Sequence, residues 1–197
     1  MIRKAMIVLS GLALMAWTAG CRVNVDKGEN GQEKKVQVDT PFGGIHVNTD
    51  QTTAADLGLP VYPGAAIAKD DEENKSADIH MGFGEWQMRI KVVSYTSSDP
   101  QDKIEAFYKK ALGRYGAVIT CQNNAPVGTP TATPEGLTCA DDRKHTNVDI
   151  GNSVQLKAGS KHHQHIVGFE NPKGGTNKFA LVAIDLPAGT ENSGTSD

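Results

Sequence analysis

The 197-residue chain lacks a hydrophobic run long enough to cross a bilayer as a permanent helix. Its longest apolar stretch, residues 5–17, holds about a dozen residues, whereas a membrane-spanning helix needs about 20. It also lacks a block of like charge long enough to form an arm, because 20 Lys and Arg residues are distributed among 23 Asp and Glu residues. Without a cationic footprint, we do not expect nucleic acid to be a partner.

The motifs of several enzyme classes are also missing. The chain contains no GxSxG nucleophile elbow, no HExxH zinc motif and no phosphate-binding GxxxxGK[ST] loop. The carboxylates of residues 70–73 run consecutively in a predicted turn, which favours a solvated surface over an acid–base pair. We therefore expect no enzymatic activity and name no catalytic residue.

The first twenty residues are typical of a secretion signal. Arg3 and Lys4 form a short basic region, residues 5–17 are almost wholly apolar, and small residues precede Cys21. The string Thr18-Ala19-Gly20-Cys21 resembles the lipobox of bacterial lipoproteins. This resemblance implies that residues 1–20 are a signal peptide and that Cys21 is lipidated. An ordinary cleaved signal or an uncleaved anchor is the alternative.

The lipobox resemblance also implies a location. Arg22 follows the lipidated cysteine, where Asp would indicate retention in the inner membrane in the enterobacterial pattern. We therefore expect a protein of the bacterial cell envelope, attached to the outer membrane and facing the periplasm. Its attachment would come from acyl chains, each buried CH₂ contributing about 0.8 kcal/mol.

The cysteine count predicts one disulfide. With Cys21 assigned to lipid, Cys121 and Cys139 remain as an even pair in an oxidising compartment. Such a bond closes a loop of roughly 17 residues, worth about 3 kcal/mol in the chain-entropy model. Two free thiols are the alternative, and the spacing fits neither a CxxC redox motif nor a zinc knuckle.

Composition divides the mature chain into three parts. Residues 21–32 are polar with two glycines, and we expect a flexible tether there. Residues 33–186 are long enough for one domain with a real core. Residues 187–197 are polar and are expected to form a disordered tail.

Two-residue alternation predicts most of a β-sheet. Residues 36–38 and 45–47 alternate on either side of a Pro-Phe-Gly-Gly turn, which predicts a hairpin with one apolar face. Residues 79–83 and 86–92 form the next pair. The phase then flips at Val93, which indicates either a β-bulge or a strand buried on both faces at its end. Further strands are expected at 117–121, 154–158, 165–169 and 179–186.

One principal helix is expected at about residues 99–115. Asp99 is the predicted N-cap, Pro100 takes the first helical position, and Gly116 ends the helix. Apolar residues follow at helical spacing between them. We therefore expect a single α+β domain, a mainly antiparallel sheet with this helix packed on one face.

A second resemblance covers roughly residues 36–121. The string Tyr62-Pro63-Gly64-Ala65, the Phe42-Gly43-Gly44 turn and the helix start at Ser97 to Pro100 resemble a group of uncharacterised, acidobacterial-type lipoproteins. The resemblance implies a shared domain. It brings no known activity and no functional residues.

Histidines are concentrated near the end of the chain, in residues 162–165. On a strand, His163 and His165 project from one face, where two imidazoles can reach one Zn²⁺, Cu²⁺ or Ni²⁺, and His162 points the other way. The third ligand would come from His145, His80, Asp141 or Asp142. A strand edge or hairpin turn whose histidines bind nothing is the simpler interpretation.

Two hypotheses follow from the sequence. The first is a non-enzymatic, lipid-anchored envelope protein, held to the membrane by Cys21, that binds an envelope protein or has a structural role. The alternative is a metal or small-ligand binding module that uses His162–His165, with Zn or Cu as its cofactor. Exposed apolar area on the sheet favours the first hypothesis, and convergent imidazoles favour the second.

Overall fold

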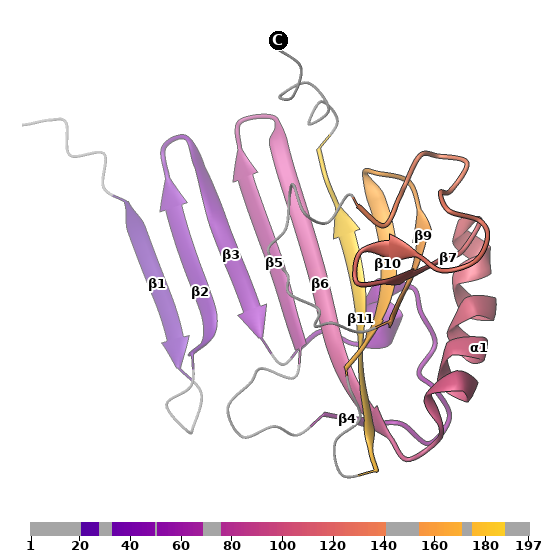
Figure 1. The fold of residues 1–197 in the computed structure, drawn as a ribbon. Helices are drawn as coiled ribbons and strands as arrows, with labels where there is room; N and C mark the ends of the chain where they lie inside the picture. Colours follow the sequence, from indigo (N-terminus) through magenta and orange to yellow (C-terminus); the bar gives the residue numbers. More distant parts are fainter. Residues whose placement is uncertain are drawn as a thin grey trace, which may run out of the picture.

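The computed structural model describes residues 21–27, 33–49, 51–68, 76–140, 154–170 and 175–187. The predicted signal peptide, residues 141–153 after Cys139 and all but the first residue of the predicted tail lie outside these residues. The described strands form one antiparallel sheet in the order β1-β2-β3-β5-β6-β11-β10-β9-β7-β8, and β4 pairs with β6 beside it (Figure 1).

The described strands are β1 (Arg22–Lys27), β2 (Glu33–Thr40), β3 (Gly43–Thr49), β4 (Ala66–Ile67), β5 (Ser76–Phe83), β6 (Trp86–Ser97), β7 (Ile119–Gln122), β8 (Ala125–Pro126), β9 (Val154–Gly159), β10 (His163–Phe169) and β11 (Asn177–Asp185). The described helices are η1 (Ala54–Leu57), α1 (Gln101–Leu112) and η2 (Gly113–Tyr115), of which η1 and η2 are 3₁₀ turns.

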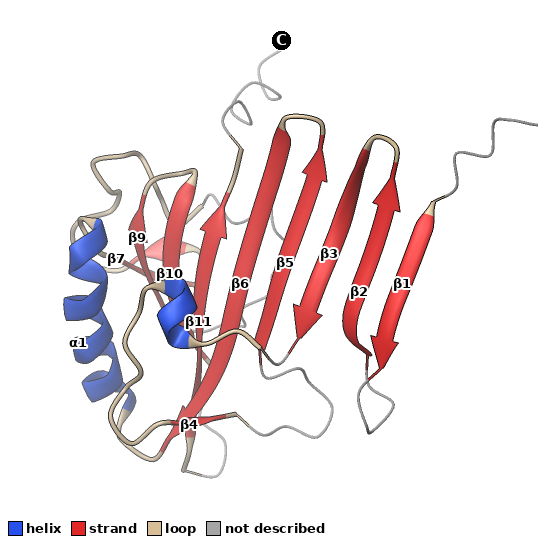
Figure 2. Cartoon of the chain, turned by 180° about the vertical axis from the view of Figure 1, so that it is seen from behind, coloured by secondary structure: helices blue, strands red, loops and turns tan. Residues whose placement is uncertain are grey.

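The predicted antiparallel sheet and its principal helix are both present. The balance differs from the α+β expectation, because strands dominate the described residues and α1 with η2 is the one long helical segment among them. Figure 2 shows this helix at one end of the sheet, beside β7, β9 and β10, while β1, β2, β3 and β5 extend away from it. The fold is therefore sheet-dominated.

The helix begins one residue later than predicted. Pro100 is the N-cap of α1, and Asp99 makes no capping hydrogen bond. The Asp99 carboxylate instead accepts a hydrogen bond from the Tyr62 hydroxyl at 2.7 Å. Ile104, Tyr108 and Leu112 are buried at i, i+4 and i+8, so one stripe of α1 faces the sheet.

The main core lies between α1 and the sheet. Tyr108 is fully buried there, and its ring lies 5.6 Å from that of Phe179 on β11. Its hydroxyl accepts from the backbone N–H of Tyr62 at 3.1 Å and donates to the carbonyl of Pro60 at 3.2 Å. These bonds hold the extended segment after η1 against the helix, because a buried hydroxyl without partners is costly.

The phase flip in β6 is not a bulge. Pairing of β6 with β5 and with β11 runs without a register shift. Ile90 belongs to a cluster on one face of the sheet, whereas Val93 and Tyr95 belong to the main core on the other. Of the two explanations left open by the sequence, a strand buried on both faces is the one observed.

The first part of the predicted tether is a strand. Arg22–Lys27 pairs antiparallel with β2, from Arg22 opposite Asp39 to Lys27 opposite Glu33. The expectation of a flexible segment over residues 21–32 is therefore wrong for β1, while residues 28–32 lie outside the described chain. The alternation of Val23 and Val25 is short, but it matches Val38 and Val36 across the pair.

Candidate interaction surface

One face of the sheet is apolar from β1 to β6. Antiparallel pairing places directly opposite residues on the same face of a sheet. Two rows run across the strands on this face. One row is Val23, Val38, Ile45, Met81 and Met88, and the other is Val25, Val36, Val47, Ile79, Ile90 and Ile184. We call these residues of β1, β2, β3, β5 and β6, together with Phe83 and Trp86, the apolar face.

Exposure on the apolar face rises toward β1. Ile184 and Ile90 are 4% and 7% exposed, the side chains of β3 and β2 in the same row are half-buried, and Val25 is 38% exposed. In Figures 1 and 2 the strands β1, β2, β3 and β5 form a single layer, and none of the described helices lies against them. Partly exposed apolar side chains arranged in continuous rows are typical of a binding surface.

The opposite face of the same strands is polar. One row there is Asn24, Gln37, His46, His80 and Arg89, and another is Asp26, Lys35, Asn48, Asp78 and Lys91. We call this the polar face. Its side chains are exposed or half-buried, as is common for the polar face of an antiparallel sheet.

Ion pairs on the polar face fix its side chains and shift their pKa values. Arg89 donates two hydrogen bonds to Asp78, the one from Nε at 2.9 Å, which lowers the pKa of Asp78 and raises that of Arg89. His46 lies 2.9 Å from the Asp39 carboxylate, and that hydrogen bond lowers the pKa of Asp39. These pairs are exposed to water, which screens them, so they suit a solvated surface.

His163 and His165 occupy alternate positions of β10 and so lie on one face, but their side chains have separate neighbours. His163 is exposed, and its Nδ1 lies 2.9 Å from the carboxylate of Asp185 on β11. The His165 ring stacks on the Tyr115 ring, with centroids 3.6 Å apart, and burial lowers the pKa of His165. The two imidazoles therefore contact different groups, a carboxylate for His163 and an aromatic ring for His165.

A third ligand for His163 and His165 is not found among the described residues, where no three His, Cys, Asp or Glu side chains are grouped to hold a metal. His80 lies on β5, three strands from β10, which corresponds to about 14 Å across a sheet. It is too distant to complete the site. His145, Asp141 and Asp142 lie outside the described chain, so the metal-binding alternative stays a prediction.

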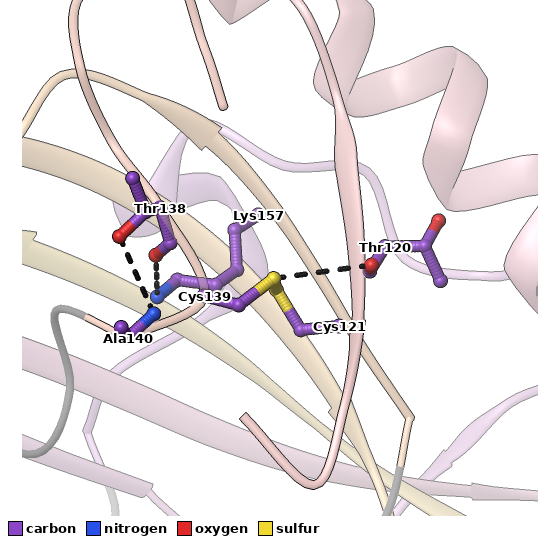
Figure 3. Close-up of a disulfide and its surroundings, with 6 residues drawn as sticks. All are labelled: Thr120, Cys121, Thr138, Cys139, Ala140 and Lys157. Carbon is purple, nitrogen blue, oxygen red and sulfur yellow. Dashed lines mark hydrogen bonds between the residues drawn. A yellow bond between two sulfur atoms is a disulfide. The ribbon is translucent and has the colours of Figure 1, made fainter. Parts of the chain in front are cut away.

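The disulfide joins Cys121 on β7 to Cys139, as predicted (Figure 3). Both cysteines are buried in a small cluster with Ile119 and Leu137. Beside them the Lys157 ammonium, on the fully buried side chain of β9, donates to the carbonyl of Thr138 at 3.0 Å. The bond thus fixes the segment after β8 to the sheet, far from the apolar face.

Cys21, the predicted lipidation site, is an exposed free thiol immediately before β1. Among the described residues, no helix is both long and apolar enough to span a membrane. Comparison of the chain with protein-family models, with curated proteins and with solved structures found no match. The interpretation of the apolar face therefore depends on its geometry and chemistry.

The sequence predicts parts of the apolar face but not how many strands it crosses. Alternation in each hairpin predicts one apolar side per hairpin. Only the register between hairpins, such as Val47 opposite Ile79, shows that the sides coincide across five strands.

Proposed function

We propose that the protein is a non-enzymatic, lipid-anchored component of the bacterial cell envelope. In this proposal, its apolar face binds an apolar surface of another envelope protein. The observation that supports this proposal is the pair of uncharged rows across β1, β2, β3, β5 and β6, together with their rising exposure. The lipid anchor is supported by the lipobox resemblance at Cys21.

The chemistry of the face favours a protein partner that is itself apolar. The rows contain only aliphatic side chains and methionines, so they offer apolar area and no charge for recognition. Burying such area gains about 25 cal/mol per Å². A flat sheet face accepts a second sheet or an amphipathic segment laid across its strands.

Anchoring is tested in cells given labelled fatty acid. The wild-type chain is expected to incorporate the label and to sediment with membranes, and Cys21→Ser is expected to lose both properties. A Cys21→Ser chain that still sediments with membranes while wild type takes up no label would refute lipid anchoring.

Partner binding is tested with a photo-crosslinking amino acid placed at Val25 or, as a matched control, at Asn24. The two positions are neighbours on β1, and the pairing register places them on opposite faces of the sheet. We expect a discrete crosslinked protein from position 25 and none from position 24. Equal products from both positions would argue against the apolar face as the binding surface.

A further inference from the structure

The end of the sheet at which β1 begins also carries exposed aromatic side chains. Arg22 is in register with Asp39, Gly44, Gly82 and Gln87 on successive strands. Phe83 and Trp86 form the next pair beyond this row, on the side where Cys21 precedes Arg22. Figure 1 shows the start of β1, the β2–β3 turn and the β5–β6 turn at the same end of the sheet.

Three aromatic side chains are exposed at this end. Phe42, in the β2–β3 turn, is 83% exposed, Phe83 is 47% exposed and Trp86 is 36% exposed. The rings of Phe83 and Trp86 lie 6.1 Å apart. We call these three residues the aromatic end.

The two turns of the aromatic end are held together. The backbone N–H of Gly84 donates to the carbonyl of Phe42 at 3.3 Å, so the tips of both hairpins are joined. Gly43 permits this approach, because a Cβ atom there would lie 2.0 Å from the carbonyl oxygen of Gly82. The aromatic side chains therefore project from one rigid unit rather than from independent loops.

The predicted lipidation site, Cys21, directly precedes β1 at the aromatic end, with no residue between them. Arg22 is already the first residue of β1, and strands advance about 3.3 Å per residue. Acyl chains on Cys21 would therefore hold this end of the sheet within a few ångströms of the lipid headgroups. The same would be true of an apolar segment retained before Cys21.

We infer that the aromatic end is a membrane contact, in which Phe42, Phe83 and Trp86 insert into the headgroup region of the bilayer to which the chain is anchored. This inference rests on the proposed function. Aromatic rings favour that region, because they combine large apolar area with tolerance of a polar boundary. The remainder of the apolar face then stands away from the membrane, where it can meet a protein partner.

Trp86 provides a direct test. The chain has two tryptophans, Trp17 and Trp86, so protein with Trp17→Phe has Trp86 as its one tryptophan whether or not residues 1–20 are removed. This protein is produced in a lipidating host and reconstituted into zwitterionic phosphatidylcholine vesicles that contain lipids brominated in the upper acyl chain. The matched control also carries Trp86→Phe and Gln87→Trp, which moves the fluorophore to the polar face at the same end.

We expect the brominated lipids to quench Trp86 strongly and to leave the tryptophan at position 87 nearly unquenched. Aqueous acrylamide is expected to show the reverse order. Phe42→Ser changes an exposed turn residue, so it should keep the fold, while it lowers the quenching of Trp86 by brominated lipid.

Two outcomes would overturn the inference. Trp86 could remain open to acrylamide on vesicle-bound protein. It could instead be shielded from acrylamide without quenching by lipid, while chemical crosslinking yields dimers, which would mean that a second copy covers the aromatic end. In either case labelled fatty acid would still be found on Cys21, so the loss of this inference would be distinguishable from failure of lipid anchoring.

Discussion

The sheet regions on the two sides of its middle strand, β6, differ in which of their faces are buried. Toward β11, β10 and β9 the strands are buried on both faces, with Phe179 and Leu181 in the main core and Val182 on the other side. Toward β5, β3, β2 and β1 only one face is apolar. None of the described hydrophobic side chains on β1, β2 or β3 is fully buried.

The comparison separates two uses of the same two-residue alternation. In the region around β11, apolar residues on both faces stabilise the fold, because each is removed from water. In the region of β1, β2 and β3, the apolar residues are half-buried or exposed, so less of their area is removed from water. Under the proposed function, one half of the sheet would provide stability and the other half recognition.

Phe179→Ala should produce the largest loss of stability. The ring is fully buried and lies 5.9 Å from that of Tyr95 and 6.1 Å from that of Phe169. Removing it should cost about 3–5 kcal/mol in the free energy of unfolding, measured by urea denaturation. Val47→Ala on the half-buried apolar face should cost less than half as much, and similar losses would break the comparison.

Replacing both Cys121 and Cys139 with Ala should cost about 3 kcal/mol, since the closed loop no longer restricts the unfolded chain. Urea denaturation would measure this loss. Photo-crosslinking through position 25 should be unchanged, because the disulfide lies at the β7–β9 end of the sheet. Loss of crosslinking in a folded double variant would show that the two regions are coupled.

His165 should make stability depend on pH in the mildly acidic range. Burial lowers its pKa in the folded state below 6.5, although Asp185 partly opposes this, so the unfolded chain binds a proton more readily. The free energy of unfolding should therefore fall as pH decreases from 6.5 to the folded-state pKa. His165→Phe, which retains an aromatic ring against Tyr115, should flatten that segment of the curve. Parallel curves for the two proteins would contradict the assignment.

Val25→Thr should have the smallest effect on stability. The residue is 38% exposed on the outermost strand, and Thr keeps the β-branched shape that suits strands. We expect a change of about 0.5 kcal/mol or less in urea denaturation, together with reduced recovery of the crosslinked partner from a probe at Val23. A large stability loss would place Val25 in the core rather than on a recognition surface.

Local patterns predicted most elements of this fold. The hairpins around residues 41–44 and 84–85, and the helix from Pro100, follow from turn residues and periodicity that act over a few positions. Strand β1 was not predicted, because two valines are too short a pattern without their partners on β2. The Asp99 side chain was misassigned, since its hydrogen bond comes from Tyr62, distant in sequence.

The candidate surface was less predictable than the fold. Alternation predicted that His163 and His165 share a face, but the stacking of His165 on Tyr115 depends on how η2 packs against β10. The apolar face likewise depends on pairing between hairpins, and on the absence of a described helix over them. Neither property belongs to any one segment, so neither can be deduced from local sequence.

The number of strands that carry the apolar face determines its width. Neighbouring strands lie about 4.8 Å apart, so the apolar face from β1 to β6 is about 19 Å wide. Adding or removing a hairpin at the β1 edge would change this width by about 10 Å and leave Cys21 at the same end of the sheet. A single added strand would reverse the chain direction and place Cys21 at the opposite end, so the width can change only in steps of two strands.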